Sequence, residues 1–334
     1  MRPIGILCGV VLLTFSCAEA PAGESLRTER DQAVRAGVRW VAAFLADPNQ
    51  AAPLGVDAVG ILSGYAASAE DEESREIAMT AARSQGSFLA TLFLAEERLS
   101  PGVILDLLYL LTENHELGLD TTALEAMARQ QIGMLPSPDS VYGEADLDPD
   151  VLERLSAPRF LGLVLGVYAV ERAAAYGFDF GIEFGLEEFV QVMRSRPLRE
   201  DDRDELDNAT HMAYLFSEYG RLLRTESDIP DAFAYVERAL PKCLAIRHID
   251  TVGEIIDIWR NVGRDETNSE AFRTGTLFLL DAQNPDGSWG RVDPRAPYAA
   301  THPTWCAIMA LGERRFKSDT PYERRLRDVL LKHP

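Results

Sequence analysis

The segment QNPDGSW, residues 283–289, marks the clearest break between two helical stretches of the chain. Residues 268–283 before it and 300–313 after it carry apolar side chains three and four positions apart. Apolar residues at these spacings lie on one face of an α-helix. Between them, Asn, Pro, Asp and Gly are typical of a loop, because Pro and Gly interrupt helices. The segment therefore predicts a helical hairpin.

The same pattern extends outward over the rest of the chain. The predicted helix pairs are 26–46 with 57–68, 72–95 with 102–116, 121–134 with 157–176, 184–195 with 205–222, and 229–246 with 250–262, before a final helix at 321–332. Pro241 is expected to break or kink its helix, because proline removes a backbone donor. Strand-like alternation is scarce. Six hairpins of about 45 to 50 residues predict an all-α fold, an (α/α)6-type toroid in which paired helices close a ring.

Two motifs carry a resemblance to known families. The Gln-x-x-x-Gly-x-Trp pattern of residues 283–289 resembles a motif of triterpene cyclases, where it also ends an outer helix. Residues 301–306, THPTWC, resemble the inner-helix start of protein prenyltransferase β subunits, in which the residue matching His302 binds zinc. Both families have the α/α-toroid fold, so the resemblance implies this fold. It does not imply their activities: the acid motif of the cyclases is missing, and Pro241 stands where the prenyltransferases have an Asp two residues before a Cys.

The composition limits the partners of the protein. Its 334 residues include 53 Asp and Glu against 33 Lys and Arg, a formal net charge of -20. A nucleic-acid-binding protein needs a surplus of Lys and Arg to displace counterions from phosphates, so nucleic acid is not an expected partner. Docking on anionic lipid headgroups is disfavoured for the same reason. A small molecule or a peptide in the ring's central cavity is the partner that we expect.

The N-terminus has the pattern of a targeting segment. Arg2 precedes the apolar residues 4–15, which predicts a signal peptide over residues 1–22 and a single toroid domain over 23–334. Residues 20–22, Ala-Pro-Ala, offer a cleavage site, whereas Cys17 resembles the lipidated cysteine of a bacterial lipoprotein. Both alternatives predict an exported protein of a bacterial cell envelope, periplasmic or lipid-anchored. Membrane contact is expected only through that anchor.

The inner helices of such a ring begin at one mouth of its cavity, where their dipoles favour anions. His211 and His302 both fall near inner-helix starts, and two His with carboxylates can hold Zn²⁺ with an open position for water. Zinc is therefore the cofactor that this pattern suggests. The alternative is that each ring N–H bonds to nearby backbone and supports a helix end.

Carboxylates near the same helix starts are the candidate catalytic groups. Asp250 and Glu254 are four residues apart, so both project from one helix face and suit acid–base work. Asp57 and Arg159 are expected to line the ligand pocket. Each Asp can instead be a helix N-cap.

The sequence leaves the activity open. The first hypothesis is an exported toroid whose central pocket binds a small molecule or a metal ion, with or without catalysis. The alternative is a non-catalytic envelope lipoprotein that acts as a binding or partner-docking scaffold, because toroid folds host both. Cys243 and Cys306 can pair as a disulfide, supply a metal ligand or be buried thiols.

Overall fold

The protein is built from α-helices joined by loops. The computed structural model describes residues 23–143, 147–196, 198–199, 203–291, 293 and 295–332. Over these residues, extended pairing is limited to isolated bridges, such as that of Ala69 with Arg314. The predicted all-α class is therefore confirmed. In this part of the chain, no helix has the length and apolar character needed to cross a bilayer. The predicted signal peptide, including Cys17, lies outside the described residues.

Six helices form an inner set whose residues are mostly buried; in α12, for example, every residue from Thr251 to Arg260 is buried. The inner set comprises α3 (Asp57–Ser68), α5 (Pro101–Glu116), α8 (Ala157–Ala175), α10 (Arg203–Ser217), α12 (Ile249–Arg260) and α14 (Pro297–Leu311). The outer set comprises α1 (Gly23–Leu45), α4 (Glu72–Leu94), α6 (Thr122–Gly133), α9 (Leu186–Ser195), α11 (Pro230–Ala245) and α13 (Glu270–Asp281). The short helices α2 (Pro48–Ala51) and α7 (Pro149–Leu152) lie in connections, and α15 (Pro321–Lys332) follows the last pair.

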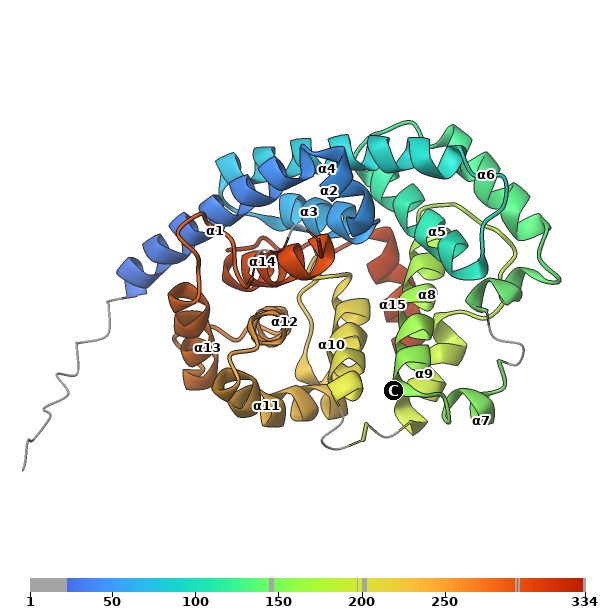
Figure 1. Cartoon of the computed structure of the whole chain (residues 1–334). Helices are drawn as coiled ribbons and strands as arrows, with labels where there is room; N and C mark the ends of the chain where they lie inside the picture. Colours follow the sequence, from blue (N-terminus) through green and yellow to red (C-terminus); the bar gives the residue numbers. More distant parts are fainter. Residues whose placement is uncertain are drawn as a thin grey trace, which may run out of the picture.

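The inner helices pack against one another in chain order. Helix α3 contacts α5, α5 contacts α8, α8 contacts α10, α10 contacts α12, and α12 contacts α14. Helix α14 in turn contacts α3, so the contacts return to the helix where they started. The outer helices cover this set: α1 lies beside α4 and against α14, while α11 and α13 both pack on α12 (Figure 1).

The loop between α13 and α14 is fastened to α1. The side-chain amide of Gln283 donates to the carbonyl of Ala33 at 2.8 Å. Trp289 is fully buried, and its indole N–H donates to the carbonyl of Leu279 at 2.7 Å. Gly287 has a φ of 93°, a backbone conformation that residues with a side chain rarely adopt. The Gln-x-x-x-Gly-x-Trp residues therefore hold helices together in this protein.

Helix α11 continues through Pro241, so a break at this residue is wrong, while the alternative of a kink stays a prediction. Pro241, which has no backbone N–H to donate, lies near the end of α11, and one face of this helix is buried. Packing of Phe233, Val236 and Leu240 outweighs the local cost of the proline.

Candidate functional site

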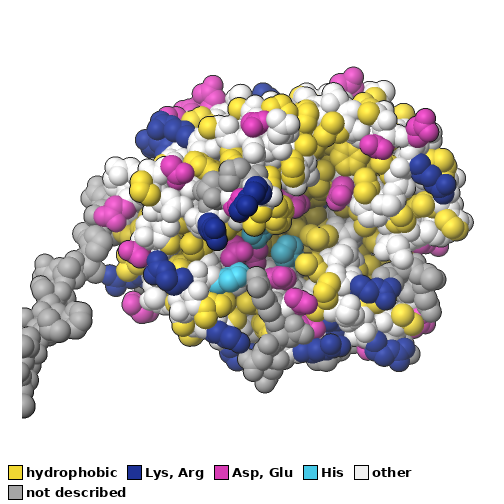
Figure 2. All heavy atoms as spheres, viewed as in Figure 1, with side chains coloured by type: hydrophobic (Ala, Val, Ile, Leu, Met, Phe, Trp, Pro, Cys, Tyr) yellow, Lys and Arg dark blue, Asp and Glu magenta, His cyan; other side chains and the backbone are white. Residues whose placement is uncertain are grey.

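A cavity of about 330 Å³ opens among the inner helices. Its walls come mainly from α3, α10, α12 and α14, with Tyr109 of α5 and two leucines of α8. Figure 2 shows this hollow, where His side chains lie beside Asp and Glu and next to hydrophobic surface. Of the residues expected at the site, five line the cavity: Asp57, His211, Asp250, Glu254 and His302.

Arg159 lies elsewhere. Arg159 is exposed in the first turn of α8 and does not line the cavity. Leu161 and Leu165 of the same helix do line it. A helix residue two positions from a lining residue projects from a different face. The structure therefore does not bring Arg159 to the pocket.

Three potential metal ligands converge on one wall of the cavity. Glu254, His302 and Cys306 each offer one donor atom, and these atoms all lie within 4.8 Å of one another. His302 and Cys306 are four residues apart on α14, so they share a helix face. Glu254 faces them from α12, where Gly253 allows a close approach, since a Cβ there would lie 2.7 Å from that of Cys306.

The distances between the donor atoms are near those of a metal centre. Nε2 of His302 lies 3.8 Å from Oε1 of Glu254 and 3.9 Å from Sγ of Cys306. With bond lengths of about 2.0 to 2.3 Å, ligand atoms of tetrahedral zinc are about 3.3 to 3.6 Å apart. The two distances from Nε2 of His302 exceed these values by a few tenths of an ångström, and the donor atoms of Glu254 and Cys306 lie within 4.8 Å of each other.

The other nitrogen of His302 faces a different carboxylate. Nδ1 lies 3.7 Å from Oδ2 of Asp250, whose second oxygen is 2.8 Å from Nδ1 of His248. Burial opposes ionisation of Asp250, but the nearby imidazoles of His302 and His248 outweigh it and lower the pKa of the carboxyl. Asp250 is thus an ionised carboxylate held between two imidazoles.

Burial shifts the titration of the three candidate ligands. It raises the pKa of the Cys306 thiol to about 12 and also raises the pKa of Glu254. Burial disfavours charge on His302, but its neighbours Cys306 and Asp250 outweigh this effect and raise the pKa of the imidazole. A divalent cation would reverse these preferences, because coordination deprotonates a thiol and holds carboxylates ionised.

His211 lines the cavity but is not part of this cluster. Its Nδ1 lies 2.8 Å from the backbone carbonyl of Asp207. A carbonyl only accepts, so Nδ1 carries the proton and Nε2 keeps its lone pair. Burial lowers the pKa of His211, which favours the neutral ring. The residues grouped with His302 as potential metal ligands are Glu254 and Cys306, so His211, which the sequence paired with His302, is not among them.

Cys306 is a potential ligand that the sequence left among three alternatives and did not place beside His302. Cys243 and Cys306 are both buried, and no disulfide joins them, so the disulfide alternative is not realised. The available signal was the four-residue spacing of His302 and Cys306, which places both on one helix face. The position of Glu254 opposite them depends on how α12 and α14 pack.

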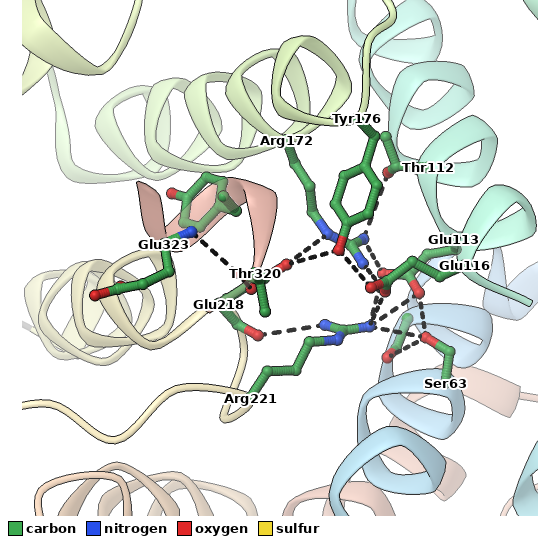
Figure 3. Close-up of polar contacts among 12 residues, drawn as sticks. Ser63, Thr112, Glu113, Glu116, Arg172, Tyr176, Glu218, Arg221, Thr320 and Glu323 are labelled. Atoms are coloured by element: carbon green, nitrogen blue, oxygen red, sulfur yellow. Dashed lines mark hydrogen bonds and ion pairs between the residues drawn. The ribbon is translucent and has the colours of Figure 1, made fainter. Parts of the chain in front are cut away.

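The opposite ends of the inner helices hold a buried ion network (Figure 3). The guanidinium groups of Arg172 and Arg221 converge on Glu113 and Glu116, and all but Glu116 have fully buried side chains. Arg221 lies 3.0 Å from Oε2 of Glu113. Glu218 extends the network, with its Oε1 3.4 Å from Nε of Arg172.

One turn connects this network to the cavity. Glu218 and Tyr219 have φ values of 49° and 50°, a conformation that non-glycine residues rarely adopt. The turn directs Glu218 into the network, while Tyr219 lines the cavity and stacks on Tyr214 with ring centroids 5.2 Å apart. Strain of this kind persists where surrounding contacts hold it and is common beside functional sites.

Comparison of the chain with protein-family models, with curated proteins and with solved structures finds no match. The functional reading therefore depends on the geometry of the cavity.

Proposed function

We propose that the protein binds a zinc ion through Glu254, His302 and Cys306 and is a metal-dependent enzyme acting on a small molecule in the cavity. The observation that carries this proposal is the convergence of three chemically suitable donors within 4.8 Å at the cavity wall. Structural zinc sites have four protein ligands, whereas catalytic sites have three and keep a position open. Zinc in such a site polarises a carbonyl or activates water.

Nε2 of His302 is the ligand nitrogen in this proposal, because it is the one near Glu254. Nδ1 then donates to Asp250, the arrangement in which a carboxylate orients a zinc-bound imidazole. Asp250 is a positioning residue here, and Glu254 is a ligand. These roles replace the acid–base pair expected from the sequence.

His211 is the proposed proton acceptor. Its Nδ1–H is committed to a backbone carbonyl, so Nε2 can accept a proton in the same cavity. A neutral imidazole near the metal is suited to general-base work at neutral pH.

Metal content tests the proposal. We expect about one zinc per chain, lost in His302→Ala and Cys306→Ser and kept in His211→Ala. Cys243→Ser is the matched control, because it removes a second buried thiol outside the cavity. A folded wild-type protein that takes up no zinc, or a Cys306→Ser variant with unchanged zinc, would refute the metal site.

The open coordination position has its own test. In cobalt-substituted protein, acetohydroxamate should change the visible absorption of the metal by adding a ligand. An unchanged spectrum at saturating acetohydroxamate would indicate a closed, structural site and would refute the enzyme proposal.

The wider architecture and location complete the proposal. The cyclic order of inner-helix contacts supports an (α/α)6-type toroid around the cavity.

The pattern of residues 1–22 supports export, with Cys17 or the segment after it as the processing point. Mass spectrometry of the mature N-terminus tests this, and an intact Met1 in the producing cell would count against export.

A further inference from the structure

A second, smaller hollow adjoins the cavity between α5 and α8, next to the start of α3. Its volume is about 200 Å³, and its walls include two carboxylates and three tyrosine rings, those of Asp57, Asp106, Tyr109, Tyr168 and Tyr219. Asp57, Tyr109 and Tyr219 line both spaces, so one ligand can reach from the hollow into the cavity. Both carboxylate residues are exposed to water through these openings although protein surrounds them.

The two carboxylates have no cationic partner. Among the residues described, no Lys or Arg lines either the cavity or the hollow. Asp257, also at the cavity, is paired with Arg314. The guanidinium groups of Arg172 and Arg221 are committed to the glutamates of the ion network. Among the residues described that line these spaces, only imidazoles can therefore offset negative charge there, and those of His211 and His302 lower the pKa of Asp57.

The pKa values of the two groups agree with this geometry. Burial raises the pKa of Asp57, against the opposing effect of His211 and His302. Burial and the neighbouring Asp57 raise the pKa of Asp106 to about 6. Neighbouring carboxylates repel each other, and a cation between them would relieve this repulsion.

The tyrosines make the hollow suited to an organic cation. The ring centroid of Tyr168 lies 4.8 Å from that of Tyr219 and 5.9 Å from that of Tyr109. Tyr168 is almost fully buried, and its hydroxyl has no hydrogen-bond partner in the described part of the chain. Aromatic faces attract ammonium groups, and a hydroxyl oxygen accepts from an N–H. A Ca²⁺ ion would need six or more oxygen ligands, which this wall does not offer.

We propose that this hollow binds the ammonium group of an amine-bearing small molecule, the rest of which extends into the cavity. Asp57 and Asp106 supply the opposite charge, and the tyrosine rings enclose the alkyl part beside it. The inference that the remainder reaches the metal rests on the proposed function. Binding of the amine itself does not.

Calorimetry with three six-carbon probes tests the hollow. Hexylamine, 1-hexanol and hexanoate have the same chain and differ in the charge of the head group. We expect hexylamine to bind at least ten times more tightly than 1-hexanol at pH 8, with hexanoate the weakest. Equal affinity of hexylamine and 1-hexanol, or displacement of hexylamine by millimolar Ca²⁺, would overturn the proposal.

Variants then assign the binding to these residues. Asp57→Asn and Asp106→Asn should each weaken hexylamine binding at least tenfold, with a folded circular-dichroism spectrum. Asp281→Asn, at an exposed carboxylate of α13, is the matched control and should have no effect. Wild-type affinity in both cavity variants would overturn the assignment. If one of these variants does not fold, the other variant and the three wild-type affinities decide.

Zinc content measured on the same samples separates this inference from the proposed function. Hexylamine binding that depends on Asp57 in a protein without zinc would refute the metal centre and leave the ammonium site standing. One equivalent of zinc together with no preference for hexylamine over 1-hexanol would support the metal centre and refute the ammonium site.

Discussion

The two nitrogens of His302 face different carboxylates, those of Glu254 and Asp250. In the proposed site these carboxylates have different roles, Glu254 as a ligand and Asp250 as a positioning residue. Nε2 lies 3.8 Å from the Glu254 carboxylate and Nδ1 lies 3.7 Å from the Asp250 carboxylate. Sγ of Cys306 lies near both nitrogens, 3.9 Å from Nε2 and 3.7 Å from Nδ1. A carboxylate behind a metal-bound imidazole fixes the orientation of the ring and raises its basicity. Asp250 is therefore expected to affect zinc affinity without touching the metal.

Asp250→Asn tests this role. Loss of the carboxylate charge behind His302 should weaken zinc binding by about 10- to 100-fold, as is typical for such partners. Saturating zinc should still load one equivalent, because the three ligands remain. Competition with a chromophoric chelator gives the affinity, and Asp281→Asn on α13 serves as control. Unchanged affinity in Asp250→Asn would remove Asp250 from the site.

Part of this site could be predicted from individual residues. Asp57, His211, Asp250, Glu254 and His302 were expected at one cavity mouth because they follow the starts of inner helices, and all of them line the cavity. The ligand set could not be predicted in the same way. The partner of His302 depends on the register between α12 and α14, which is set by packing over residues such as Gly253 and is not encoded locally.

Element boundaries follow from local patterns in most of the chain. Proline at helix starts has a preset φ and no donor to lose, which places the beginnings of α5 and α14 near Pro101 and Pro297. The Asp71 side chain accepts from the backbone N–H of Ser74 at 2.9 Å and begins α4. Pro241 shows the limit of local reasoning, because tertiary packing keeps α11 helical across it.

The loop that fastens α13 to α1 gives a prediction for an element. Gly287→Ala would place a Cβ about 2.8 Å from the carbonyl oxygen of Ala36 at a φ of 93°. We expect the free energy of unfolding to fall by about 1 to 3 kcal/mol, the usual cost of such strain. Gly133→Ala, at the end of α6 with open space around it, should be neutral or slightly stabilising. Urea unfolding measures both, and equal stability of the two variants would contradict this account of the loop.

Opposite ends of the inner helices have opposite chemistry across the whole molecule. The amino ends surround a cavity with carboxylates and imidazoles, while the carboxyl ends hold Arg172 and Arg260, where cations suit the helix dipole. The buried network of Arg172, Arg221 and the glutamates closes the far end and holds the strained turn at Tyr219. Periodicity could predict the helices, but these long-range ion pairs could not be read from it.

The network makes stability depend on pH. Burial opposes ionisation of Glu116, but Arg172 and Arg221 outweigh it and lower the pKa of the carboxyl below its ordinary value. A lowered folded-state pKa stabilises the protein above the unfolded-state pKa, and this contribution is lost as pH falls through the folded-state pKa. Glu116→Gln should therefore cost about 2 to 3 kcal/mol near pH 7, with the difference from wild type shrinking below about pH 4.

Urea unfolding of wild type and Glu116→Gln between pH 3 and 7 measures this difference. Glu72→Gln, at a carboxylate 86% exposed on α4, is the control and should follow the wild type. A stability difference that stays constant across the range would mean that the ion pairs of Glu116 do not hold the network.

X-ray absorption at the zinc edge of the metal-loaded protein tests the central claim most directly. The account predicts one sulfur at about 2.3 Å together with nitrogen and oxygen ligands at about 2.0 to 2.2 Å. The sulfur shell should vanish in Cys306→Ser and persist in Cys243→Ser. A wild-type first shell without sulfur, or one unaffected by Cys306→Ser, would contradict a metal centre formed by Glu254, His302 and Cys306.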